Sequence, residues 1–336
     1  MKAMVLEHTA PIAEQPNPLR MTEVLDPEPA SHELLIEVTA CGVCHTELDE
    51  IEGRLATAKM PIIPGHEVVG RVAKRGESVA MYRVGDRVGV GWIHHSDGQP
   101  DENLSPAFCA TGCDVDGGYA QYMTVPARYA VAIPESLSDT EAAPLLCAGA
   151  IGYRALALCN LSDGQPLGLM GFGASGHLTL PLAKHLYPGA PVFVFVRGES
   201  TQAFARQLGA DWSGPIDATA PLPCHAIIDT TPAWWPVVQS LRHLAPGGRL
   251  VINAIRKEET DKKTLLELDY HRDLWMEREV KSVANLTHRD ITQFMRVAGT
   301  IPLRPTVRVF QLQDANAALR DLRQGNMQGA NVLSVA

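Results

Sequence analysis

The sequence predicts an α/β protein of two domains, in which an all-β, barrel-like domain is followed by a doubly wound parallel sheet. Its 336 residues exceed the usual size of a single domain, so two cores are expected. Short apolar runs separated by Gly, Pro and Asp turns fill the chain up to about residue 150. From Leu167 onward, strand-like and helix-like runs alternate, which is typical of a parallel sheet covered by helices.

In the first domain, β-rich runs predict strands over residues 34–38, 68–72 and 87–90. The tail of the chain contains one further predicted strand, 306–310, and one predicted helix, 314–322. These two elements are too few to fold alone, so we expect the tail to return to the first domain. That domain would then comprise residues 1–152 and 290–336.

The second domain, residues 153–289, shows the alternating pattern most clearly. The Gly171 turn separates its first strand from its first helix, which is expected to extend to Leu186. Thr287 with Asp290 resembles a helix cap. The other expected elements are strands over residues 167–170, 192–196, 226–229, 247–252 and 280–283, and helices over 201–208 and from Thr231-Pro232 onward.

The composition is that of an ordinary globular protein, with 46% apolar and 20% charged residues. A formal charge of −9 argues against a nucleic-acid partner, because such proteins usually carry a basic face. The trio of Lys257, Lys262 and Lys263 is expected to be a solvated loop.

The N-terminus reaches Glu7 too early for a signal peptide, and no run approaches the roughly 20 apolar residues of a membrane span. We therefore expect a cytoplasmic protein without a membrane partner. Seven cysteines, an odd and scattered set, do not resemble a secreted disulfide framework. Reduced thiols and metal ligation are the better interpretation.

Two cysteines and one histidine could serve one metal ion. Cys44 closes a Cys-x-x-Cys pair with Cys41, His66 lies in the run Gly65-His66-Glu67, and Cys147 follows much later. Alone, the Cys-x-x-Cys pair could also be a redox dithiol, a structural zinc knuckle or two core cysteines. Together, the three side chains suit a catalytic zinc, which keeps three protein ligands and an open fourth position.

With Gly70, Gly76 and Val79 and the run from Ala143 to Gly149, this pattern resembles the zinc-containing alcohol dehydrogenases of the medium-chain dehydrogenase superfamily. The resemblance covers nearly the whole chain and is strongest to a short bacterial subgroup. It implies a GroES-like barrel domain, a Rossmann nucleotide-binding domain, and a cleft between them where substrate and nicotinamide meet.

The resemblance also implies the roles of the metal-site residues. Cys44, His66 and Cys147 would be the zinc ligands, the set found in alcohol dehydrogenases, and Cys41 a non-ligand. Glu67 would be a nearby carboxylate able to approach the ion. The zinc would polarise the alcohol oxygen and lower its pKa, so that hydride can leave.

By the same resemblance, Thr46 supplies the hydroxyl that hydrogen-bonds the reacting alcohol and starts a proton relay. Glu47 could orient a zinc ligand. Asp49 stands where the family often has a histidine; it could pass on the proton, or water could do so directly. Trp92 is implied to lie near the reacting atoms, with a core aromatic as the alternative.

Many relatives carry a second, structural zinc held by four cysteines. Here Asp97, Pro100 and Asn103 stand at the first three positions, and only Cys109 could survive. One thiolate cannot hold a tetrahedral site built for four, so we predict one zinc per chain. Cys109 and Cys113 are expected to pack in the interior, and the His94-His95 pair, taken as exposed, is expected to bind no metal tightly.

The run Gly171-Phe172-Gly173-Ala174-Ser175-Gly176 fits the dinucleotide motif G-x-G-x-x-G between a predicted strand and a predicted helix. Its backbone and helix N-terminus would hold the pyrophosphate, so Gly171, Gly173, Ala174, Ser175 and Gly176 are assigned to the cofactor. His45 is assigned to it as well. No carboxylate ends the next strand, and Arg197 could pair with a 2′-phosphate, which favours NADP over NAD.

These features predict reversible oxidation of a primary or simple secondary alcohol to its aldehyde or ketone, with hydride passed to NADP or NAD. A polyol dehydrogenase is the enzymatic alternative, because sugar-alcohol enzymes share both motifs. A non-catalytic nucleotide-binding protein is the alternative from another class, and the intact metal set argues against it. Family members are dimers or tetramers, so a homo-oligomer is expected.

Overall fold

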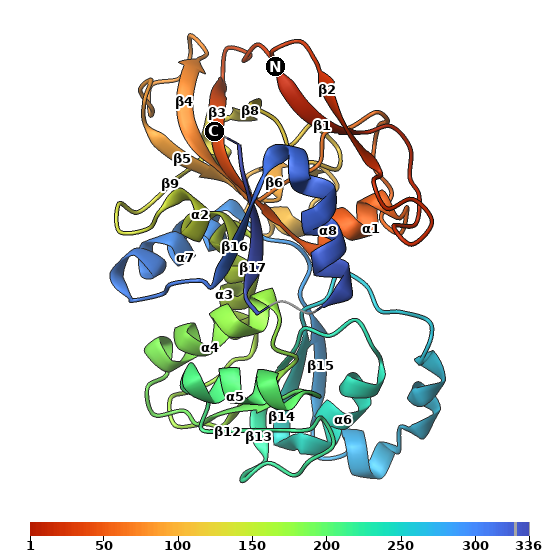
Figure 1. Cartoon of the computed structure of the whole chain (residues 1–336). Coiled ribbons are helices and arrows are strands. Elements are labelled where there is room, and N and C mark those ends of the chain that lie inside the picture. Colours follow the sequence, from red (N-terminus) through yellow and green to blue (C-terminus); the bar gives the residue numbers. More distant parts are fainter. Residues whose placement is uncertain (326–327, 336) are drawn as a thin grey trace. The chain divides into compact units, whose positions relative to one another are not determined.

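The computed structural model describes residues 1–325 and 328–335. The chain forms two compact units, one of Met1–Ala150 with Asn285–Ala336 and one of Ile151–Ala284. Figure 1 shows that strands dominate the first unit, whereas a sheet lies among helices in the second. The sequence placed the domain boundaries after residues 152 and 289, and this division falls after Ala150 and Ala284.

A seven-stranded sheet forms the frame of the first unit. Its strand order is β16-β17-β3-β4-β5-β9, and β8 also pairs with β3. Two small sheets accompany it, one of β1 and β2 and one of β6 and β7. The strands are β1 (Lys2–Leu6), β2 (Leu19–Glu23), β3 (Glu33–Val43), β4 (Val68–Arg75), β5 (Arg87–Val90), β6 (Ile93–His95), β7 (Cys109–Ala110), β8 (Tyr122–Pro126), β9 (Val131–Ala132), β16 (Val307–Gln311) and β17 (Ala330–Ser334).

Helices and short turns connect these strands. Thr287 forms a capping box with Asp290 at the start of α7, which confirms the cap predicted there. The helices of this unit are α1 (His45–Ile51), α2 (Asp139–Ala142), α7 (His288–Thr300) and α8 (Ala315–Gln324), and 3-10 turns cover Glu102–Leu104, Ala127–Tyr129, Ala143–Leu146 and Leu312–Asp314.

Strand β3 leads from the sheet to Cys41 and Cys44. Leu34 and Ile36 are buried while Glu37 is exposed, the alternation expected of a strand with one face on the core. From Cys41 to Val43 every residue is buried, and the chain then turns into α1. The tail covers the other edge of this segment, since β17 pairs antiparallel with it in the register Leu333 opposite Cys41.

The second unit contains a six-stranded parallel sheet in the order β12-β11-β10-β13-β14-β15. The order reverses beside β10, so the carboxyl ends of β10 and β13 form the switch point at which such sheets bind ligands. Its strands are β10 (Leu167–Met170), β11 (Val192–Phe195), β12 (Trp212–Gly214), β13 (Cys224–Asp229), β14 (Leu244–Ile252) and β15 (Glu279–Ser282). Its helices are α4 (Ala174–Leu186), α5 (Glu199–Gln207) and α6 (Trp235–His243), and short helical turns cover Lys262–Glu267 and Tyr270–Leu274. Helix α3 (Ala148–Leu158) begins in the first unit and ends in the second.

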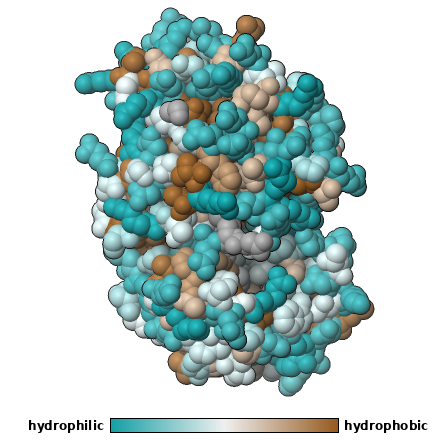
Figure 2. All heavy atoms as spheres, in the orientation of Figure 1, coloured by the Kyte–Doolittle hydropathy of each residue, from teal (hydrophilic) through white to brown (hydrophobic). Residues whose placement is uncertain are grey.

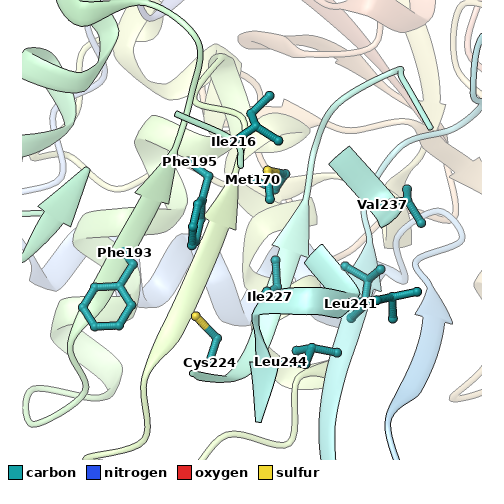
Figure 3. Packing of buried hydrophobic residues seen from close by; sticks show 10 residues of the cluster. Met170, Phe193, Phe195, Ile216, Cys224, Ile227, Val237, Leu241 and Leu244 are labelled. Atoms are coloured by element: carbon teal, nitrogen blue, oxygen red, sulfur yellow. The ribbon is translucent and has the colours of Figure 1, made fainter. Parts of the chain in front are cut away.

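Apolar side chains of neighbouring strands pack with those of α6 in the core of this unit. Figure 3 shows Met170 and Ile227 on neighbouring strands, Phe195 beside them, and Leu241 facing them from α6. Each such side chain contributes about 1.5–3 kcal/mol when it leaves water. The predicted fold class, a barrel-like β domain with a doubly wound parallel sheet, is confirmed by the two sheets.

The predicted start of α6 at Thr231-Pro232 is wrong, because the helix begins at Trp235. The carboxylate of Asp229 accepts hydrogen bonds from the backbone N–H and the hydroxyl of Thr231, at 3.0 and 2.8 Å. These bonds hold Thr231 in a turn directly after β13, and such local side-chain bonds compete with helix formation.

Within the described ranges, no helix is both long and apolar enough to cross a bilayer. Figure 2 shows hydrophilic residues over most of the displayed face, with hydrophobic residues scattered among them. Scattered apolar residues of this kind are normal on a protein surface.

Candidate functional site

The first unit brings four potential metal-ligand side chains together. One ligand atom each from Cys44, His66, Glu67 and Cys147 lies within 4.8 Å of the others. Cys44 directly precedes α1, His66 and Glu67 directly precede β4, and Cys147 lies between a 3-10 turn and α3. The structure therefore groups the three residues predicted as zinc ligands, with Glu67 beside them.

The start of α1 positions Cys44 and Thr46. The N–H of Cys44, the N-cap residue, donates a hydrogen bond to the Glu47 carboxylate at 2.7 Å, so the helix start is fixed by a residue three positions later. Thr46 is 8% exposed, and its hydroxyl oxygen lies 3.6 Å from the Cys44 sulfur. The helix thus holds the hydroxyl of Thr46 at the metal-ligand group.

Glu47 also contacts His66, and both side chains are fully buried. His66 Nδ1 lies 2.6 Å from Glu47 Oε1. Burial alone would lower the pKa of His66, but the neighbouring Glu47 charge raises it well above its usual value. Nε2 of His66 is buried and has no hydrogen-bond partner among the described residues. A metal ion at Nε2 would displace the proton from that nitrogen, while the Nδ1 proton would stay beside the Glu47 carboxylate and orient the ring.

The two thiols influence each other. Hydrogen bonding with Cys147 holds the pKa of Cys44 well below its usual value, although burial opposes this. The same contact with Cys44, together with burial, raises the pKa of Cys147 well above its usual value. Two neighbouring sulfurs that compete for one proton are better accommodated by a cation, which favours both thiolates.

Glu67 is buried and fits the site only because residue 42 is glycine. Its Oε1 accepts a hydrogen bond of 3.3 Å from the N–H of Ala148. A Cβ atom at Gly42 would overlap the Glu67 side chain. Burial, and then the charge of Cys44, raises the pKa of Glu67 well above its usual value.

The structure gives Asp49 a partner that the sequence did not reveal. Arg54 Nε donates to Asp49 Oδ1 at 2.6 Å, and the carboxylate side chain is 9% exposed. Glu50, also on α1, is buried, and burial followed by the charge of Glu47 raises its pKa well above its usual value. No sequence pattern marked Glu50, because its burial depends on how α1 packs.

Trp92 lies beside the metal-ligand group. The Trp92 and His66 ring centroids are 6.1 Å apart. Phe108 packs edge-on against Trp92, with the two ring centroids 5.7 Å apart.

At the positions where many relatives have the cysteine lobe, Asp97 accepts a hydrogen bond from the N–H of Gln99 within a local turn. Cys113 is buried, and its sulfur lies 3.5 Å from the carbonyl oxygen of Ala56.

The glycine-rich loop of the second unit joins β10 to α4. Gly171 has φ +89°, a conformation that favours glycine, and Gly176 packs so closely that a Cβ atom would lie 2.7 Å from the Gly171 carbonyl oxygen. A Cβ at Gly173 would meet nothing within 4 Å, so the loop is open where a ligand could approach. Ala174 and Ser175 are the first residues of α4 and present backbone N–H groups at its N-terminus.

Arg197 follows β11, the strand next to β10. Its side chain is exposed and has no hydrogen-bond or ion-pair partner among the described residues. Gly198 caps α5 and Glu199 begins it, so a carboxylate lies close by in sequence. His45, the other residue assigned to the cofactor, is exposed at the first position of α1 in the first unit.

Lys257 differs from its expected place in a solvated loop. Its ammonium lies 2.5 Å from a carboxylate oxygen of Asp229, and the two side chains are 7% and 0% exposed. Asp229 ends β13, so this buried ion pair stands at the switch point of the sheet. Lys262 and Lys263 are exposed, as expected.

The chain is similar to alcohol dehydrogenases in sequence and in structure. Residues 30–135 match the family described as "Alcohol dehydrogenase GroES-like domain". The "Probable alcohol dehydrogenase AdhA" of Mycobacterium tuberculosis is 40% identical over 95% of this chain and 93% of its own, and an "Alcohol dehydrogenase" of Geobacillus stearothermophilus is 30% identical over 94% and 96%. A solved cinnamyl alcohol dehydrogenase of Sorghum bicolor superposes with a TM-score of 0.85, at 26% identity, over 99% and 97% of the chains.

These relatives do not favour the polyol or non-catalytic alternatives. They match the chain over nearly its full length, and the grouped cysteines and histidine lie within the matched region. The chain belongs to the zinc-type medium-chain alcohol dehydrogenase family and is an oxidoreductase that acts on alcohols.

Proposed function

We propose that Cys44, His66 and Cys147 bind one zinc ion, and that the enzyme interconverts a primary or simple secondary alcohol with its aldehyde or ketone, using NADP(H) in preference to NAD(H). The observation that carries this is the grouping of two thiols with a buried imidazole whose Nε2 has no other partner among the described residues. That donor set fits a catalytic zinc.

When bound, the zinc ion supplies Lewis-acid polarisation of the substrate oxygen. The chain's own residues would move the proton. Thr46 would accept the proton of the substrate hydroxyl and at the same time pass its own hydroxyl proton outward. Because Arg54 holds the Asp49 carboxylate, we propose that water takes the proton next and that Asp49 contributes less. Glu67 would remain a nearby carboxylate, held by Ala148.

The experiment that tests this function measures turnover and zinc together. The purified enzyme, dialysed against a weak chelator, is expected to retain one zinc per chain and to reduce aldehydes with NADPH. A strong chelator should abolish turnover, and added Zn²⁺ should restore it. Two tightly held zinc ions per chain would contradict the single-site proposal. Turnover that survives complete zinc removal would contradict the zinc mechanism.

Cofactor preference is tested at Arg197. A charge-assisted hydrogen bond is worth about 1.5–3 kcal/mol, so Arg197→Ala should raise the KM for NADPH by roughly ten- to a hundredfold. The KM for NADH should change little, since that cofactor has no 2′-phosphate. Arg206→Ala is the matched control, because Arg206 is another exposed arginine of the same unit that bonds to Ser213. Equal changes for both cofactors would remove the NADP argument.

We further propose that the enzyme is a homo-oligomer, a dimer or tetramer joined through the second unit. β15 pairs with β14 on one side only among the described strands, and all four of its residues are exposed. Trp275 and Val280 are 48% and 49% exposed near this edge strand. An open strand edge with apolar neighbours is suited to pairing with a second copy. A monomer mass by light scattering would contradict this.

A further inference from the structure

The first unit contains a second group of metal-ligand side chains, separate from Cys44, His66 and Cys147. One imidazole nitrogen each from His94 and His95 and the sulfur of Cys109 lie within 4.8 Å of one another. Two imidazoles with one thiolate are ligands that suit zinc and similar transition metals. The group lies on β6 and β7, in the region where many relatives carry their cysteine lobe.

A β-bulge brings the two histidines together. Ile93 lies opposite Ala110 and His95 lies opposite Cys109, so His94 is an additional residue on β6. Successive side chains of a regular strand point to opposite faces, and the bulge lifts that restriction. The Nδ1 atoms of His94 and His95 are 3.0 Å apart. Cys109, as the register partner of His95, is placed next to both rings.

A hydrogen bond at Nε2 of His94 leaves Nδ1 available as a ligand atom. Its Nε2 lies 3.2 Å from the Thr124 carbonyl oxygen, and because a carbonyl only accepts, Nε2 carries the proton. Nδ1 therefore keeps its lone pair and faces the group. A backbone carbonyl commonly fixes metal-binding histidines in this way. The prediction that both histidines are exposed is wrong for His94, which is 6% exposed.

Exposure determines how readily such a site would exchange a cation. The Cys109 side chain is partly exposed. His95 is exposed, which gives solvent and cations access to the group. The arrangement therefore suits an exchangeable ion rather than one that is kept through dialysis.

We propose that His94, His95 and Cys109 bind one exchangeable Zn²⁺ ion through two imidazole nitrogens and the thiolate. The ion would link β6 to β7, whose ladder is short because β7 has two residues. This site is additional to the single tightly held zinc of the proposed function and does not depend on it.

The test uses the dialysed holoenzyme, in which tightly held zinc occupies the catalytic position, and adds Co²⁺ as a spectroscopic probe. We expect one Co²⁺ per chain and the charge-transfer absorption of a cobalt–thiolate bond, and we expect added Zn²⁺ to remove that absorption. Zinc released from the protein is measured in parallel, so that exchange at the catalytic position is detected.

Cys109→Ser should remove the absorption, and His95→Ala should weaken Co²⁺ binding roughly tenfold or more. Cys113→Ser is the matched control, because Cys113 lies four residues away but outside the ligand group, and it should keep the absorption. No absorption with the wild-type enzyme, or equal absorption with Cys109→Ser, would overturn the proposal. Failure of the proposed function would instead be seen as zinc-independent turnover.

Discussion

Thr46→Ala is expected to lower kcat by about 10²- to 10⁴-fold, the range that general acid–base groups contribute. The hydroxyl of Thr46 is buried beside the sulfur of Cys44, where a substrate oxygen would bind if Cys44 ligates the zinc. Thr46→Ser keeps the hydroxyl and should retain most of the activity. The measurement is kcat for both variants together with their zinc content, which should stay at one per chain.

Asp49→Ala provides the contrast within the same helix. We expect a modest fall in kcat and a slightly lower melting temperature, because Arg54 loses the Asp49 carboxylate that it contacts at 2.6 Å but keeps its ion pair with Glu52. If Asp49→Ala reduced kcat as strongly as Thr46→Ala, with zinc content and melting temperature unchanged, Asp49 would belong to the proton relay after all.

Glu47→Ala is expected to weaken zinc binding by roughly ten- to a hundredfold, as is typical when the partner of a metal-binding histidine is removed. Glu47 acts on two proposed ligands at once. It lies 2.6 Å from His66 Nδ1 and accepts a hydrogen bond from the N–H of Cys44 at 2.7 Å. Its loss would free the imidazole to rotate and would also loosen the start of α1. Competition with a chelator of known zinc affinity measures the change.

Glu50→Gln is the matched control for Glu47, because both are buried glutamates of α1 and only Glu47 contacts His66 closely. The zinc affinity of Glu50→Gln should differ from that of the wild-type enzyme by no more than about threefold. Glu47→Gln should fall between the two, since an amide oxygen can still accept from Cys44. Equal zinc affinities for Glu47→Ala and the wild-type enzyme would show that Glu47 does not position His66.

The elements that could be predicted from the sequence are those with local causes. The strand before Gly171 and the helix after it were expected because one strand, one turn and one helix N-terminus are encoded in adjacent residues, and β10 and α4 lie there. The cap at Thr287 could be predicted for the same reason, because its partner Asp290 follows within the same turn of the chain. Grouping Cys44, His66 and Cys147 required the family resemblance, because nothing local connects residues so far apart in the chain.

What could not be predicted depends on contacts through space. Arg54 follows Asp49 at a spacing with no special meaning until α1 ends and the chain turns back. The sequence predicts a solvated Lys257 because its partner Asp229 lies 28 residues earlier. It predicts an exposed His94 because it does not reveal the bulge that forms when β6 pairs with β7. In each case tertiary packing changed the expected environment of a charged or titratable group.

The pairing of β17 with β3 has a consequence for biosynthesis. The strand that leads to Cys44 leaves the ribosome well before its edge partner, Ala330–Ser334, has been translated. The intervening residues 151–284 form the other compact unit and can fold while translation continues, since domains generally fold as units during synthesis. The unit that holds the proposed zinc ligands is therefore completed only after Ala330–Ser334 has emerged, and until then the edge of β3 at Cys41 and Gly42 lacks its partner.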